Sequence, residues 1–117
     1  MPGTLRISAD PNHVREILIN VMQNAVDILL QDNGLIHCFP VHSAESYSKI
    51  QIEDNGRGIP ETLQKEIFNP FFTTKSQGTG LGLAIARALA RANHGDLILD
   101  KSDESGTIFS ILFKNAK

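Results

Sequence analysis

The sequence predicts an α/β (α+β) fold, a two-layer sandwich in which a mixed sheet of about five strands carries its helices on one face. Three observations support this prediction: short stretches that alternate apolar and polar residues, two longer stretches with apolar residues at helical spacing, and a closing pair of strands joined by a turn. We expect one domain over residues 1–117, which is long enough to bury one core.

The first part of the chain is predicted to form a strand and a long helix. Residues 5–8 alternate and indicate a short strand. Asp10 then caps a helix that has Pro11 at its first position, and Asn33-Gly34 ends this helix just after residue 31. One apolar stripe runs along it: Val14, Ile17, Leu18, Val21, Met22, Ala25, Ile28 and Leu29.

The rest of the chain is predicted to contain a second long helix and four strands. This helix opens at the glycine-rich stretch 78–83, runs to about Asn93 and is closed by Gly95. Its predicted buried stripe is Leu81, Ile85, Leu89 and Ala92. The other predicted elements are strands over residues 35–41, 49–54, 96–101 and 107–113, a short helix over residues 61–66 and a hairpin turn over residues 103–106.

The composition excludes several classes of function. A net charge of −2 gives no basic surface for nucleic acid or for an anionic membrane. Cys38 is the single cysteine, which excludes an internal disulfide and a cysteine-rich metal site, and we predict that it is a small core residue. No apolar run approaches membrane-spanning length and no signal peptide is present, so we expect a cytoplasmic domain, even if a longer protein is anchored in a membrane. Met1-Pro2-Gly3 is interpreted as an added leader, which would make the chain an excised domain.

Asp54 is the first candidate for a ligand-binding residue. It follows an alternating run, in which it shares the core-facing side of a strand with Ile50 and Ile52. A carboxylate aimed into a core is costly unless hydrogen bonds are donated to it, and only the glycine-rich turn that follows is placed to do so. Gly56 and Gly58 would also let a ligand approach the backbone. An Asx-type turn that only ends the strand would explain the residues next to Asp54, but neither the inward carboxylate nor Gly58.

Two asparagines and a glycine-rich stretch are further candidates. Asn20 and Asn24 lie one turn apart at the edge of the apolar stripe, where a solvated face would normally carry charged residues. Residues 78–83, Gly-Thr-Gly-Leu-Gly-Leu, open a helix, where backbone N–H groups and the helix dipole cradle phosphate. This stretch lacks the Lys-Ser/Thr of a Walker loop and the spacing of a dinucleotide fingerprint, so it predicts a phosphate loop of another class.

An aromatic cluster precedes the glycine-rich stretch. Three of the six phenylalanines lie within residues 68–72, and a polar tail follows them. The pattern indicates a packed anchor followed by a mobile loop, with Phe68 and Phe71 predicted to be ordinary core residues.

Taken together, these stretches resemble the catalytic ATP-binding domain of sensor histidine kinases, in the superfamily that also contains gyrase, Hsp90 and MutL. The resemblance spans about residues 5–113. It rests on four motifs in family order: an asparagine box at residues 20–25, a first glycine box at 54–60, a phenylalanine box at 68–72 and a second glycine box at 78–83. The Phe-Phe-Thr-Thr-Lys and Gly-Thr-Gly-Leu-Gly-Leu stretches resemble histidine kinases more than gyrase or MutL.

The resemblance implies a site for Mg²⁺-ATP. Asn24 would be a Mg²⁺ ligand, Asn20 would support the metal or a phosphate, and Asp54 would accept a hydrogen bond from the adenine amine. Thr107 would help to hold adenine, and Lys75, within a lid over the phosphates, would contact phosphate and complete the catalytic set with the two asparagines. The other predicted nucleotide-binding residues are Gly56, Gly58, Ile59, Phe71, Thr74, Thr79, Gly80, Leu81, Gly82 and Leu83.

The resemblance implies an ATP-dependent protein histidine kinase. It would transfer the γ-phosphate to a histidine on a separate dimerisation and phosphoacceptor domain, upstream of a response regulator in two-component signalling. An ATPase or conformational clamp of the same superfamily is one alternative, but gyrase-like ATPases carry a glutamate where this chain has Asn20, an amide that cannot act as a general base. An anti-sigma-factor-type serine kinase, which shares the boxes, and a nucleotide-binding module without catalysis are the others. The family often has another glycine where Asp96 follows His94-Gly95, a position that we assign to a helix cap.

Overall fold

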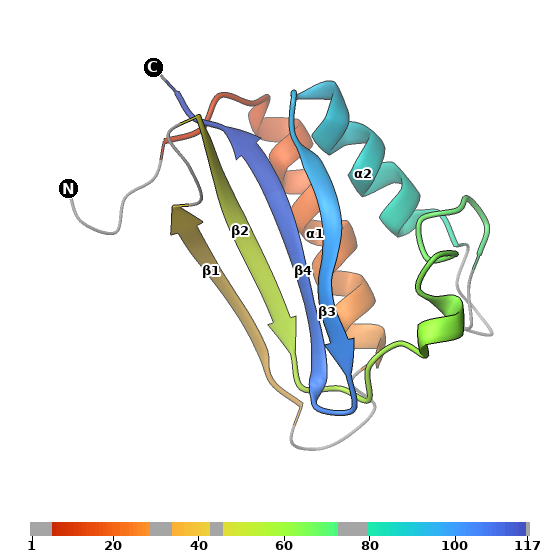
Figure 1. Cartoon of the computed structure of the whole chain (residues 1–117). Coiled ribbons are helices and arrows are strands. Elements are labelled where there is room, and N and C mark those ends of the chain that lie inside the picture. The colour runs from red at the N-terminus through yellow and green to blue at the C-terminus, as the bar shows by residue number, and fades with distance from the viewer. Residues whose placement is uncertain (1–5, 29–33, 43–45, 73–79, 117) are drawn as a thin grey trace.

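The computed structural model describes residues 6–28, 34–42, 46–72 and 80–116. Within this part of the chain, two long helices cover one face of a four-stranded sheet, which confirms the predicted two-layer fold (Figure 1). The elements are, in chain order, α1 (Pro11–Ile28), β1 (Ile36–His42), β2 (Tyr47–Asp54), the 3₁₀ turn η1 (Glu61–Leu63), α2 (Gly82–Ala92), β3 (Asp96–Asp103) and β4 (Gly106–Lys114).

The strand order is β1-β2-β4-β3, and each of the pairings within it is antiparallel. The prediction of a mixed sheet is therefore wrong. The chain returns through α2, so β2 and β3 run in the same direction, but β4 lies between them and pairs with both (Figure 1). The strand predicted over residues 5–8 is represented in the described residues by one bridge, between Ile7 and Asn115, so the described sheet has four strands, fewer than predicted.

The helix α1 begins as predicted. Asp10 Oδ1 accepts hydrogen bonds from the N–H groups of Asn12 at 2.8 Å and His13 at 3.4 Å, which satisfies two unpaired donors of the first turn. Met22, assigned to the apolar stripe, is more exposed than predicted. The predicted end of the helix beyond Ile28 falls largely in residues 29–33, which lie outside the described residues. The leader predicted over residues 1–3 lies outside them as well. The stripe residues that the structure buries fully are Ile17, Val21 and Ala25.

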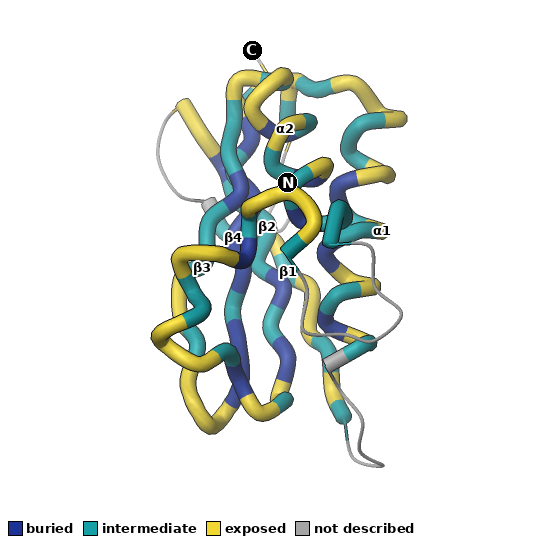
Figure 2. Tube along the Cα trace, turned by 90° about the vertical axis from the view of Figure 1, so that its right-hand side faces the viewer, coloured by how far each residue is buried: buried dark blue, intermediate teal, exposed yellow. Residues whose placement is uncertain are grey.

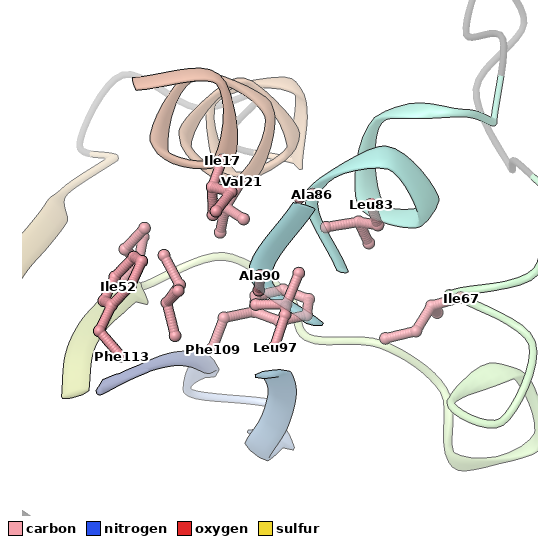
Figure 3. Close-up of a cluster of buried hydrophobic side chains, with 11 residues drawn as sticks. Ile17, Val21, Ile52, Ile67, Leu83, Ala86, Ala90, Leu97, Phe109 and Phe113 are labelled. Carbon is pink, nitrogen blue, oxygen red and sulfur yellow. The ribbon is translucent and has the colours of Figure 1, made fainter. Parts of the chain in front are cut away.

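The core lies between the helical layer and the sheet. Figure 2 shows buried positions along the central strands and at intervals along α1, next to them. Figure 3 shows how both helices, three strands and the segment before α2 contribute to one cluster. Its labelled members are Ile17, Val21, Ile52, Ile67, Leu83, Ala86, Ala90, Leu97, Phe109 and Phe113.

The buried side of α2 differs from the prediction. Leu83, Ala86 and Ala90 are buried, whereas Ile85 and Ala92, both assigned to the buried stripe, are exposed, Ile85 to 40%. The prediction gave most weight to large aliphatic side chains. In the structure, the small alanines let α2 pack closely against both α1 and the sheet, as Figure 3 shows for Ala86 and Ala90.

The helix α2 ends at Ala92, and His94, two residues later, adopts the left-handed conformation with φ of 66°. The N–H groups of His94 and Gly95 donate to the carbonyls of Arg91 and Ala90 at 3.1 and 2.9 Å, the pattern of a Schellman cap. Gly95 is required for a different reason, because a Cβ there would lie 1.8 Å from the carbonyl oxygen of Leu112. The assignment of this segment to a helix cap is confirmed, with His94 as its left-handed residue.

Two further local predictions are wrong. Cys38 is exposed, because it lies on β1, an edge strand, and α2 packs at the opposite edge of the sheet, against β3 (Figure 1). The helix predicted over residues 61–66 is one 3₁₀ turn, Glu61–Leu63, followed by turns. Among the described residues, none of the helices is both long and apolar enough to cross a membrane.

Candidate functional site

The carboxylate of Asp54 lies inside the molecule at the end of β2. Asp54 is only 3% exposed, and its Oδ1 accepts a hydrogen bond from the N–H of Gly56 at 2.9 Å. Burial raises the pKa of Asp54 above its ordinary value, although hydrogen bonds from the backbone of Gly56 and Thr107 act in the opposite direction. The inward carboxylate predicted from the strand alternation, and its donor in the glycine-rich turn, are therefore confirmed.

A chain of hydrogen bonds connects Thr107 to the loop that follows Asp54. Thr107 is 1% exposed and lies directly opposite Asp54 in the register of β2 and β4. Its Oγ1 lies 2.8 Å from Oγ of Ser102, which also accepts a hydrogen bond from the N–H of Ile59 at 2.7 Å. The carbonyl of Ile59 accepts in turn from Nε2 of Gln64 at 2.9 Å. Sequence reasoning missed Ser102, since only the register between β3 and β4 places it beside Thr107.

Two glycines bring the end of β2 against the turn between β3 and β4. Gly58 has a φ of 79°, and a Cβ there would lie 2.1 Å from the carbonyl oxygen of Asp103. At Gly106, a Cβ would lie 1.9 Å from the carbonyl oxygen of Asp54. Gly58 is thus required so that the loop can pack on the hairpin. That Gly56 and Gly58 also let a ligand approach the backbone stays a prediction.

A surface hollow lies between the loop that follows β2 and the turn between β3 and β4. Its walls are formed by residues 57–61, Gln64 and residues 102–105. Ser102 lines the hollow and also contacts Thr107, whereas neither Asp54 nor Thr107 is among the described residues that line it.

Asn20 on α1 lies against the first turn of α2. A Cβ built on Gly82 would be 3.5 Å from Oδ1 of Asn20. The Asn20 amide nitrogen donates to the carbonyl of Glu16 at 3.0 Å, so the amide oxygen is the atom that faces the start of α2. Asn24 is half-buried and lies one turn further along the same side of α1. The structure therefore brings the asparagine box next to the second glycine box.

Phe71 and Gly80 bring two backbone segments together before α2. The N–H of Phe71 donates to the carbonyl of Gly80 at 2.9 Å, and both residues have positive φ, 69° and 75°. The prediction that Phe71 is a core residue is wrong, because it is 74% exposed at a left-handed position. Phe68 is half-buried as predicted, with its ring edge-on to Phe109 at 6.2 Å between centroids and Arg87 above it at 4.5 Å.

The remaining predicted site residues fall into two groups. Leu81 is half-buried at the N-cap of α2, and Leu83 is part of the buried core. Thr74, Lys75 and Thr79 lie outside the described residues.

The donor set near α2 fits a Mg²⁺ ion that is held mainly by phosphate and water. Among the described residues, no three His, Cys, Asp or Glu side chains gather into a metal cage. Mg²⁺ next to phosphate keeps several waters and uses only one or two protein oxygens. The amide oxygen of Asn20 lies beside the amino-terminal end of α2 and takes no part in the hydrogen bond that its nitrogen makes. Asn24, one turn further along α1, offers a second amide oxygen of the same kind.

Comparison with known proteins gives the same assignment as these motifs. Residues 9–117 match the family described as histidine kinase-, DNA gyrase B-, and HSP90-like ATPase. The signal transduction histidine-protein kinase AtoS of Escherichia coli (strain K12) is 40% identical over 106 residues, which cover 91% of this chain and 17% of AtoS. Sporulation kinase A of Bacillus subtilis (strain 168) is 34% identical over 110 residues, which cover 94% of this chain and 18% of that kinase. The chain thus spans less than a fifth of the length of these two relatives.

A solved structure agrees in both fold and sequence. The nucleotide-free catalytic domain of histidine kinase ThkA matches with a TM-score of 0.82 and 32% identity, over 97% of this chain and 74% of that one. The chain therefore belongs to the family of histidine kinase-, DNA gyrase B- and HSP90-like ATPases, and within it to the histidine kinases.

Proposed function

We propose that this chain binds Mg²⁺-ATP and transfers the γ-phosphate to a histidine of a separate dimerisation and phosphoacceptor domain, which in turn serves a response regulator. Membership of a family of ATPases supports the binding of ATP. The observation that carries the site is the buried carboxylate of Asp54. It lies at the end of β2, toward the same end of the molecule as the second half of α1 (Figure 1), and Asn20 of α1 lies against the start of α2. One nucleotide would join these parts, its base at Asp54 and its phosphates at α2.

At the base end, Asp54 would accept a hydrogen bond from the exocyclic amine of adenine. The carboxylate is buried, so water competes poorly for it, and a charge-assisted hydrogen bond is stronger than a neutral one. Adenine differs from guanine in offering an amine donor at this edge, so the carboxylate would also select the base. Thr107, Gly56, Gly58 and Ile59 would complete the base end.

At the phosphate end, the first turn of α2 would supply backbone N–H groups from Gly80, Leu81 and Gly82. When bound, Mg²⁺ would neutralise phosphate charge, with Asn24 as its protein ligand and Asn20 beside it. We assign Lys75, Thr74, Thr79 and Phe71 to the phosphate side on the family pattern alone.

The chemistry needs position more than a reactive side chain. An imidazole nitrogen of the acceptor attacks the γ-phosphorus, the bond from that phosphorus to the bridging oxygen breaks, and ADP leaves with the electron pair. The chain would hold the γ-phosphate in line for this attack. Hydrolysis should be slow, because Asn20 is an amide where gyrase-like ATPases have a glutamate base.

The test is incubation with γ-labelled ATP, alone and with a dimerisation domain that carries an acceptor histidine. We expect acid-labile label on the added domain only. Two of the chain's four histidines have structural places: His13 is bonded to Asn93 at 3.0 Å and His94 forms the cap of α2. An added domain with its acceptor histidine replaced is the control. Label on this chain alone, or rapid phosphate release without any phosphoprotein, would overturn the proposal. We also propose that the activity is cytoplasmic, where ATP is available.

A further inference from the structure

We propose that Ser102 is a positioning residue of the nucleotide site, whose hydroxyl orients Thr107 so that Thr107 donates its proton to a ring nitrogen of the bound base. The inference rests on the proposed function, because it takes Asp54 and Thr107 as the pair that contacts adenine. Ser102 lies in none of the four boxes.

The hydrogen bonds around Ser102 assign the direction of each proton. A serine or threonine hydroxyl has one proton to donate and two lone pairs to accept with. The N–H of Ile59 is only a donor, so at 2.7 Å it occupies a lone pair of Ser102 Oγ. In the contact of 2.8 Å between the hydroxyls of Ser102 and Thr107, one of the two hydroxyls must therefore donate its proton to the other.

A bound base decides between the two directions. If Ser102 donates to Thr107, the Thr107 proton is free for a ring nitrogen, and every donor from Ile59 to the base has an acceptor. In the opposite direction, Thr107 donates its proton to Ser102, and the ring nitrogen receives no hydrogen bond. Thr107 is 1% exposed, so water does not readily replace the missing partner. The N–H on Ser102 Oγ also polarises this hydroxyl and makes it a better donor.

An irregularity in β3 places Ser102 on the correct face. Leu97 and Leu99 face the core, so simple alternation would point residue 102 to the opposite face. The register between β3 and β4 shifts between Leu99 and Lys101, where Asp100 is the extra residue, and Ser102 therefore lies opposite Thr107. On the outer face, Oδ2 of Asp100 accepts hydrogen bonds from Ser110 and Gln51, which fixes the bulge.

The same contacts attach both ends of the loop after β2. The backbone of Thr107 bonds the carboxylate of Asp54 at the start of the loop, and Ser102 holds Ile59 near its end. In Figure 1 this loop passes beside the turn between β3 and β4. Ser102 is therefore able to transmit a change at the loop to Thr107 without touching the nucleotide.

The experiment compares ATP with its 1-deaza, 3-deaza and 7-deaza analogues, each of which lacks one ring nitrogen, by calorimetry. In the wild type, one analogue should bind about three- to tenfold more weakly than ATP, which is the loss of one hydrogen bond. Ser102→Ala should weaken ATP by a similar factor and should no longer discriminate against that analogue. The threonine of Ser102→Thr and the valine of Ser102→Val have the same shape, but only threonine keeps the hydroxyl. Only Ser102→Thr should therefore discriminate against that analogue as the wild type does.

The controls separate this role from a structural one. Ser105→Ala changes an exposed serine of the same hairpin, bonded to Asp103, and should bind all four nucleotides as the wild type does. Thermal melting reports whether each variant folds. If Ser102→Ala does not fold, the comparison of Ser102→Thr with Ser102→Val tests the inference. An equal loss for ATP and all analogues in Ser102→Val would overturn the inference, as would a wild type that binds ATP without discriminating against any analogue. A folded wild type that binds no ATP would instead overturn the proposed function itself, and the inference with it.

Discussion

Asp54→Asn should separate nucleotide binding from folding. The substitution keeps the shape of the side chain and an oxygen that accepts from Gly56, but it removes the negative charge and places an amide donor where the adenine amine would donate. The lost charge-assisted hydrogen bond is worth roughly 1.5–3 kcal/mol. The dissociation constant for ATP should therefore rise about ten- to 150-fold.

The fold itself should tolerate the change. Burial raises the pKa of Asp54, so its ionisation costs free energy in the folded protein. The stability that this group contributes is complete below its unfolded pKa of about 3.9 and is lost as the pH rises through its folded pKa. Asparagine does not titrate, so the free energy of unfolding of the wild type, minus that of the variant, should fall as the pH rises over this window.

Two measurements check the reasoning. Calorimetry at neutral pH gives the affinities for ATP, and urea denaturation without nucleotide at several pH values gives the stabilities. A folded Asp54→Asn protein that binds ATP with wild-type affinity would refute the adenine assignment. A stability difference that increases with pH would refute the assigned direction of the pKa shift.

Three other substitutions test separate parts of the structure. Asn24→Ala should weaken ATP binding more with Mg²⁺ than with EDTA, since the amide oxygen is a ligand only when the metal is present; an equal loss in both titrations would indicate a structural asparagine. Gly82→Ala should fold normally, because its methyl group would lie at an ordinary 3.5 Å from Asn20 Oδ1, yet it should weaken ATP more than adenosine in competition assays; equal effects on the two would contradict a phosphate site at α2. His94→Gly should raise the free energy of unfolding by about 1 kcal/mol, since glycine adopts the left-handed φ of 66° at no steric cost. Urea denaturation measures this, with Gly95→Ala as the destabilising control, and an unchanged midpoint for His94→Gly would argue against the cap.

The sequence alone determined the features that depend on neighbouring residues. Strand alternation before Asp54 predicted its inward carboxylate, and the glycine two residues later supplied the donor. Asp10 followed by proline predicted the start of α1. The polar pair Asn20 and Asn24, placed beside an apolar stripe, predicted a special edge of that helix, and the structure puts Asn20 against Gly82.

Only the tertiary structure decided which residues from distant segments meet. The bulge at Asp100 turns Ser102 toward Thr107, and alternation by itself assigns it to the other face. The edge position of β1 exposes Cys38, and the close approach of α2 to both α1 and the sheet selects Ala86 and Ala90 rather than Ile85 for its buried side. Local patterns specify backbone conformation and the face of a side chain within one element. Which elements become neighbours, and how closely they approach, depends on packing across the whole core, where size and register matter more than hydrophobicity.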